Sequence, residues 1–203
     1  MERAILLTGF EPFGGERINP SWEVAARLEG RRFGDAVIHA VRLPVNCRCA
    51  TAAVVKALEE LRPVAFLGLG QAGGRPALSL EKVALNLIDG HPAREADGGL
   101  DGNPVVVDAP DGYFSRLPLK TLLQALHERS IPAVVSLSAG VYICNAVMYV
   151  ALHTLRDHND IPAGFIHLPY EARQVMGRAA PSMSVDLMVT GIEIVLETLV
   201  STT

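Results

Sequence analysis

The chain has 203 residues, 49% of them hydrophobic, and a formal net charge of −4 at pH 7. This length and apolar content suit one large core, so we expect a single domain over residues 1–203. Acidic and basic residues are interspersed, and no apolar stretch approaches the roughly 20 residues of a membrane span, which argues against partners such as nucleic acid or a membrane.

Short β-branched runs alternate with helical patterns, which favours an α/β fold on a largely parallel sheet. The first 15 residues hold one Arg and a short apolar run without a small-residue cleavage site, so they predict a strand and no signal peptide. The expected strands are Ala4–Phe10, Ala36–Leu43, Val64–Leu69, Leu78–Ile88, Ala133–Leu137 and Gly164–Leu168.

Helical patterns separate these strands. Asn19-Pro20 supplies an N-cap and a first-turn proline for the first helix, and an apolar stripe over 50–61 marks the second. Further helices are expected over 119–126 and 185–199, and Ala146–Leu152 is apolar nearly all round, as in a helix buried on every side. Gly90–Gly112, with one strand-like run at Val105–Val107, predicts a long loop or small hairpin.

The cysteines point to reduced thiols in a cytoplasmic protein. There are three, and Cys47 and Cys49 are only two apart, which is a poor disulfide framework. No second pair of ligands completes a zinc site, so we expect no metal and read these two as helix-start residues.

Cys144 is the candidate nucleophile. It follows the strand Ala133–Leu137 and a turn, and it precedes the buried helix. Its sulfur would lie near a helix N-terminus, where backbone N–H groups and the macrodipole favour a thiolate and can bind an oxyanion. An inert buried cysteine would occupy the same position, so this alternative stays open.

A thiol nucleophile needs a base and a group that orients the base. Among six histidines His167 is the best placed, because it ends a strand, although a core histidine would look the same. His91, in the long loop, could also reach a site. Glu81 is a lone carboxylate in an apolar strand pattern: it either faces water beside Lys82 or holds the tautomer of the histidine.

Residues 68–73 read G-x-G-x-x-G after a strand, and Asp89 lies at about the right distance for a ribose contact. A dinucleotide fingerprint must open a helix, however, and here Arg75-Pro76 and an alternating strand pattern follow. We therefore interpret it as a substrate-facing loop. A non-catalytic or nucleotide-binding α/β protein is the alternative function.

Four segments carry motifs along nearly the whole chain: Gly9–Gly14 with Asn19–Ser21, Gly70–Arg75 with Ser79–Asn86, Ser138–Asn145, and Phe165–Pro169. In this order they resemble the motifs of type I pyroglutamyl peptidases, also called pyrrolidone-carboxylate peptidases. The resemblance implies a single-domain three-layer αβα fold around a largely parallel, mixed sheet.

The same resemblance implies a cysteine peptidase that hydrolytically removes N-terminal pyroglutamate from peptides, without any cofactor, through a thioacyl-enzyme. It implies a catalytic triad of Glu81, Cys144 and His167. It also implies a lactam pocket, formed by Phe10, Phe13, Asn19, Gln71, Tyr142 and Ile143. Family members are commonly homotetramers, so we expect a homotetramer in the cytoplasm.

Two positions depart from the family pattern. His91 stands where the family usually has an Arg near the site, which makes His91 a further candidate for substrate binding. Val141 stands before Tyr142, where Thr is common. Neither change touches the triad.

Overall fold

A computed structural model describes residues 3–89 and 102–201 of the chain. Its main sheet has eight strands in the order β2-β3-β1-β4-β8-β5-β6, and β7 pairs with β5. Most neighbouring strands run parallel; β2, β6 and the contact between β5 and β8 are antiparallel. The strands are β1 Arg3–Phe10, β2 Arg32–Phe33, β3 Ala36–Leu43, β4 Ala65–Gln71, β5 Leu78–Leu85, β6 Gly112–Phe114, β7 Ala133–Ser138 and β8 Ala163–Leu168.

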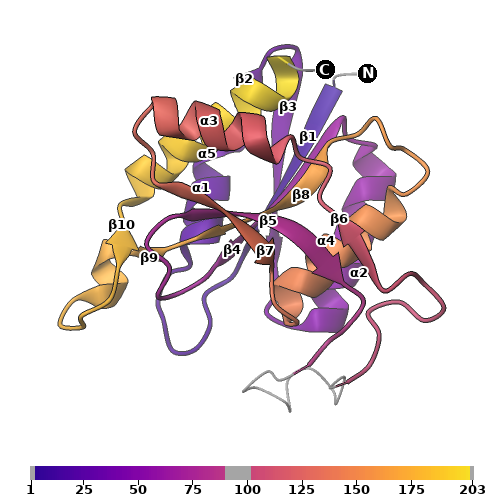
Figure 1. Cartoon of the computed structure of the whole chain (residues 1–203), viewed down its shortest axis with the longest axis horizontal. Coiled ribbons are helices and arrows are strands. Elements are labelled where there is room, and N and C mark those ends of the chain that lie inside the picture. The colour runs from indigo at the N-terminus through magenta and orange to yellow at the C-terminus, as the bar shows by residue number, and fades with distance from the viewer. Residues whose placement is uncertain (1–2, 90–101, 202–203) are drawn as a thin grey trace.

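Helices cover both faces of this sheet (Figure 1). On one face lie α1 Pro20–Leu28, α3 Leu119–Glu128 and α5 Val185–Ser201, and on the other lie α2 Cys47–Leu61 and α4 Ile143–Thr154. The expected three-layer αβα architecture on a largely parallel, mixed sheet is confirmed. None of the helices in the described ranges has the length and hydropathy of a membrane span.

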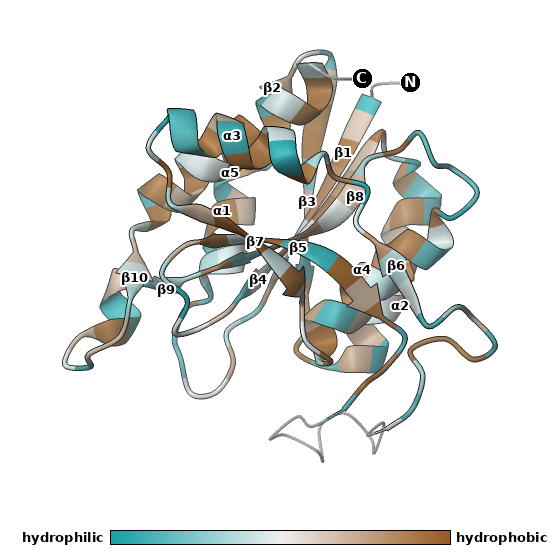
Figure 2. Ribbon diagram, in the orientation of Figure 1, coloured by the Kyte–Doolittle hydropathy of each residue, from teal (hydrophilic) through white to brown (hydrophobic). Residues whose placement is uncertain are grey.

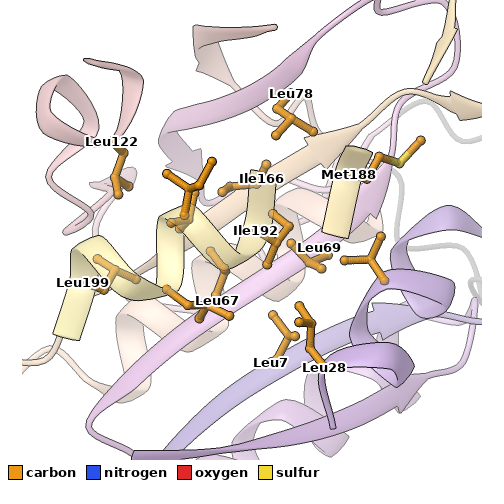
Figure 3. Close-up of a cluster of buried hydrophobic side chains, with 14 of the residues drawn as sticks. Leu7, Leu28, Leu67, Leu69, Leu78, Leu122, Ile166, Met188, Ile192 and Leu199 are labelled. Carbon is orange, nitrogen blue, oxygen red and sulfur yellow. The ribbon is translucent and has the colours of Figure 1, made fainter. Parts of the chain in front are cut away.

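Each sheet face has its own core because successive strand residues point to opposite sides. In β1, Ile5 and Leu7 join the cluster under α1, α3 and α5, whereas Leu6 joins the cluster under α2 and α4. Figure 2 shows apolar residues concentrated on the strands and on the helix sides that face them. Figure 3 shows the first cluster, in which Ile192 of α5 packs with Leu67 and Leu69 of β4.

The helix starts follow the predicted capping chemistry. Asn19 caps α1, its Oδ1 accepting from the backbone N of Ser21 at 3.1 Å, and Asn46 caps α2 in the same way through Cys49 N at 3.0 Å. Cys47 and Cys49 therefore start a helix, as expected. Every residue of α4 from Asn145 to Leu152 is buried, which confirms the helix predicted to be enclosed on all sides.

One predicted strand is shorter than expected, and one strand-like run forms no strand. The strand predicted over Leu78–Ile88 ends at Leu85, and the run Val105–Val107 forms bends and a turn. The Asn86 side chain explains both, because its amide bonds the backbone N and O of Val106 instead of continuing a ladder. Ile88 still pairs with Asn103 in an isolated antiparallel bridge. Much of the predicted loop Gly90–Gly112 lies outside the described residues.

Beyond β8 the chain forms a small substructure that the sequence did not predict. The strands β9 Tyr170–Glu171 and β10 Ser182–Met183 pair in parallel, and a short 3-10 helix, η1 Ala172–Val175, follows β9. Elements of two to four residues are too short for a periodic pattern to reveal. This substructure lies beside a cavity at the end of β4, since Tyr170 packs against Gly73 of the cavity lining.

Candidate active site

A cavity of about 480 Å³ opens where β4 and β8 end and α4 begins. The strands β4 and β8 are parallel neighbours, with Gly70 opposite His167, so their carboxyl ends meet at one edge of the sheet. Ligand sites of open α/β sheets form at such edges. Both Cys144 and His167 line this cavity.

Cys144 lies in the first turn of α4 and is partly exposed. Its N-cap residue, Tyr142, makes no side-chain capping hydrogen bond within the described part of the chain, and the backbone N–H groups of a first helical turn can bind an anion. The sulfur packs closely over β4: a Cβ placed on Gly70 would lie 2.9 Å from Sγ and 2.9 Å from the Phe165 ring. Glycine at position 70 is therefore what allows the sulfur to lie against the strand.

The pKa of the Cys144 thiol is raised to about 12, chiefly by burial and next by the charge of Glu81, while the charge of Arg75 opposes the shift. This direction is opposite to the one expected from the helix N-terminus alone. Desolvation penalises the charged form of a thiol, which is why burial acts in this direction. The resting group is the neutral thiol, which needs a base to become a nucleophile.

We expect the rate at which iodoacetamide alkylates Cys144, measured in a Cys47→Ser/Cys49→Ser background, to depend on pH as this pKa requires. Only the thiolate reacts, so the rate should rise about tenfold per pH unit from pH 7 to 10 without a plateau. Peptide mapping of the alkylated protein gives the rate at Cys144. A rate that levels off below pH 8 would mean that the thiolate is already formed and would contradict this assignment.

Three hydrogen-bonded side chains, His167, Glu81 and Arg75, extend from the cavity into the protein. His167 Nδ1 lies 2.7 Å from Glu81 Oε1, and Arg75 Nη1 donates to the same oxygen at 2.7 Å. Glu81 is fully buried and His167 is 4% exposed. A carboxylate only accepts, so Nδ1 carries the proton and Nε2 is left as the basic nitrogen. Glu81 thus faces a partner and not water, which decides between the two interpretations of this residue.

The aromatic and aliphatic residues predicted to hold a lactam all line the cavity: Phe10, Phe13, Tyr142 and Ile143. Gln71 and Asn19 line it as well. Asn19 is only 2% exposed, and its Nδ2 donates to Glu11 O at 3.0 Å while its Oδ1 caps α1, so one amide N–H remains for a ligand. Glu81 lies behind His167, and His91 lies outside the described residues.

Arg75 is a cavity residue that the sequence analysis missed. A signal was present: a buried carboxylate needs a cation, and the basic residues nearest to Glu81 are Arg75 and Lys82. Strand alternation sends Lys82 to the opposite face of β5, where it is exposed, which leaves Arg75.

The segment 68–73 does not open a helix; β4 continues through Gln71, and the chain then turns into β5. Its glycines make room for side chains. A Cβ on Gly68 would lie 2.4 Å from the Phe165 ring, and one on Gly73 would lie 2.1 Å from the Tyr170 ring. These glycines allow aromatic side chains to pack closely around the cavity. Because no helix follows them, they do not form a nucleotide-binding loop.

Other described histidines lie outside the cavity lining. His153 Nδ1 is 2.9 Å from the hydroxyl of Tyr113, and His127 Nε2 is 2.8 Å from the carbonyl oxygen of Ala133. Within residues 3–89 and 102–201, no group of three or more His, Cys, Asp or Glu is arranged to hold a metal ion.

Comparison with known proteins gives one consistent result. The family model described as pyroglutamyl peptidase matches residues 3–202. Pyrrolidone-carboxylate peptidase of Yersinia pestis (strain Pestoides F) is 41% identical over 196 residues, which cover 96% of this chain and 91% of the relative. The solved structure of pyrrolidone carboxyl peptidase from the hyperthermophile Pyrococcus furiosus has a TM-score of 0.93 at 40% identity and covers 98% of this chain and 99% of that one. A mutant of the same Pyrococcus enzyme has the same TM-score.

Proposed function

Because the chain belongs to the pyroglutamyl peptidase family of cysteine-type hydrolases, we propose that it removes N-terminal pyroglutamate from peptides by a thioacyl-enzyme route with Cys144, His167 and Glu81 as its triad. The observation that carries this proposal is the hydrogen bond of 2.7 Å between Glu81 and His167 behind a cavity that Cys144 also lines. Cys144 would be the nucleophile, His167 the base, and Glu81 the group that orients the base.

In the first half of the reaction, Nε2 of His167 takes the thiol proton as Sγ attacks the pyroglutamyl carbonyl carbon. The backbone N–H groups of the first turn of α4 stabilise the oxyanion that forms. The C–N bond then breaks, His167 returns the proton to the leaving amine, and a pyroglutamyl thioester remains on Cys144.

In the second half, His167 takes a proton from water, which attacks the thioester. The C–S bond breaks, free pyroglutamate leaves, and the thiol regains its proton. Glu81 stabilises the imidazolium in both halves through Nδ1. Arg75 balances the charge of this buried carboxylate and lies close enough to Cys144 to lower the pKa of its thiol, against the effect of burial.

The cavity composition supports a neutral flat ring as the recognised group. Aromatic and branched side chains line the cavity, and the amides of Asn19 and Gln71 lie among them. A charged amine buried there would lack a partner, so the site favours the closed lactam over open-chain glutamine.

We expect kcat/KM for a pyroglutamyl amide to exceed that for a prolyl or glutaminyl amide by at least roughly 10³-fold, the scale set when polar groups of a site go unpaired. Fluorogenic amides of the three residues measure this directly. Phe13→Ala should raise KM more than it changes kcat, because Phe13 touches the ring and not the reacting atoms. Comparable kcat/KM values on prolyl and pyroglutamyl amides would contradict the proposal that the cavity selects the lactam ring.

The proposal extends to a homotetramer in the cytoplasm. All three cysteines are free, as reduced thiols require. Strand β7, which pairs with β5, exposes Val135 and Leu137 on one side at 40% and 76%, and Val134 on the other side at 49%. Exposed apolar side chains on such a strand are suited to contact with another copy. Sedimentation velocity should give four times the chain mass, and a monomer at micromolar concentration would contradict it.

A further inference from the structure

Gln174 is a buried amide that the mechanism above does not use. It lies in η1 and is 7% exposed, so its amide must find partners inside the protein. One of them is Gln71, which lines the cavity although 103 residues separate the two in sequence. Gln174 therefore connects the β9–η1 substructure to a residue that faces the substrate.

Two backbone groups determine which atom of the Gln174 amide is the oxygen and which is the nitrogen. The N–H of Glu171 can only donate, so the Gln174 atom 2.9 Å from it is Oε1. The carbonyl of Ile18 can only accept, so the atom 3.4 Å from it is Nε2. The two contacts agree, and they leave the NH2 group of Gln174 directed at Gln71.

This orientation in turn defines the Gln71 amide. Gln174 Nε2 donates to Gln71 Oε1 at 2.9 Å, so the oxygen of Gln71 is already occupied by a donor. The group that Gln71 has left for the cavity is its NH2, a donor. A pyroglutamyl ring offers one acceptor that proline lacks, the ring carbonyl oxygen, and a donor at this position reads that oxygen.

We propose that Gln174 is a positioning residue for substrate selection: it holds Gln71 so that an amide N–H faces the ring carbonyl oxygen of the pyroglutamyl group. This inference rests on the proposed function, since it assumes a lactam in the cavity. It concerns recognition and not the chemical step, because the hydrogen bonds of the Gln174 side chain go to Glu171, Ile18 and Gln71.

The test is Gln174→Glu, which keeps the size of the side chain and an acceptor for the Glu171 N–H but cannot donate. Gln71 should then turn its NH2 towards position 174 and present Oε1 to the cavity. We expect KM for a pyroglutamyl amide and Kd for 2-pyrrolidone, a ring with the same carbonyl, each to rise roughly tenfold to a hundredfold. Binding of pyrrolidine, whose cationic amine donates, should be equal or tighter.

Gln124→Glu makes the same chemical change on the exposed side of α3 and should leave all these values unchanged. The alkylation rate of Cys144 should also stay at the parent value in Gln174→Glu, because the nucleophile is not disturbed. If Gln174→Glu fails to fold, Gln174→Met removes the donor without adding charge and should raise Kd for 2-pyrrolidone roughly threefold to tenfold.

Unchanged Kd for 2-pyrrolidone in both variants at position 174 would overturn the inference. So would an equal loss for 2-pyrrolidone, pyrrolidine and Cys144 alkylation, since that pattern indicates general damage to the fold. Kd from calorimetry needs no turnover, so a parent protein that binds 2-pyrrolidone but cleaves no pyroglutamyl amide would sink the proposed function while the inference could still be tested.

Discussion

Cys144→Ser is expected to lower kcat/KM for a pyroglutamyl amide by at least roughly 10⁴-fold, about 5.4 kcal/mol of transition-state stabilisation. A hydroxyl has a much higher pKa than a thiol, so the same histidine cannot activate it to a useful degree. The geometry around position 144 should survive, because oxygen is smaller than sulfur and the contact with Gly70 only loosens.

Cys49→Ser is the matched control for this change. Cys49 is exposed at the start of α2 and lies outside the cavity lining, so the variant should keep the parent kcat and KM. Circular dichroism and thermal unfolding of both variants separate loss of chemistry from loss of fold. Parent-like turnover by Cys144→Ser would remove the basis of the mechanism.

His167→Ala should cost about as much as loss of the nucleophile, because residues that act as a unit do not have additive effects. The Cys144 thiol, with its pKa raised to about 12, needs a base to form the thiolate at neutral pH. Glu81→Gln should cost less, roughly 10² to 10³-fold in kcat, since an amide oxygen can still accept from Nδ1 but no longer stabilises the imidazolium.

His158→Ala serves as the control for the histidine change, because His158 is exposed after α4. Single-turnover kinetics on each variant report the acylation step itself. Small and equal losses at His167 and Glu81 would reassign this pair to a structural role. A loss at His167 that excess imidazole in solution restores would support its role as the base.

Much of the fold could be predicted because its signals are local. The main strands and most of the helices described over residues 3–89 and 102–201 follow from hydrophobic periodicity, whereas α4 follows from its continuous apolar run. The capping residues Asn19 and Pro20 mark where α1 begins. The run Val105–Val107 has the β-branched residues that suit a strand, but it forms none, because the Asn86 side chain bonds the backbone N–H and carbonyl of Val106. At this position the contact between Asn86 and Val106, 20 residues apart, decides the structure, and not the local strand propensity.

The site could be predicted only in part, for the same reason. The types and positions of Cys144, His167 and Glu81 make each a candidate. That Glu81 lies behind His167, which lines the cavity with Cys144, depends on the pairing of β8 with β4 and β5. The pKa of the thiol depends on burial in the folded chain, which no spacing reveals. Gln174 was not a candidate, because its partner Gln71 lies on a strand far away in sequence.

The most direct test of the central claim is to trap the acyl-enzyme. The protein is mixed with excess pyroglutamyl amide, quenched in acid within the first turnover, digested and analysed by mass spectrometry. We predict a mass increase of one pyroglutamyl group on the peptide that contains Cys144, and none in Cys144→Ser. A pyroglutamyl adduct on another residue, or full turnover by protein whose Cys144 is completely alkylated, would contradict the account.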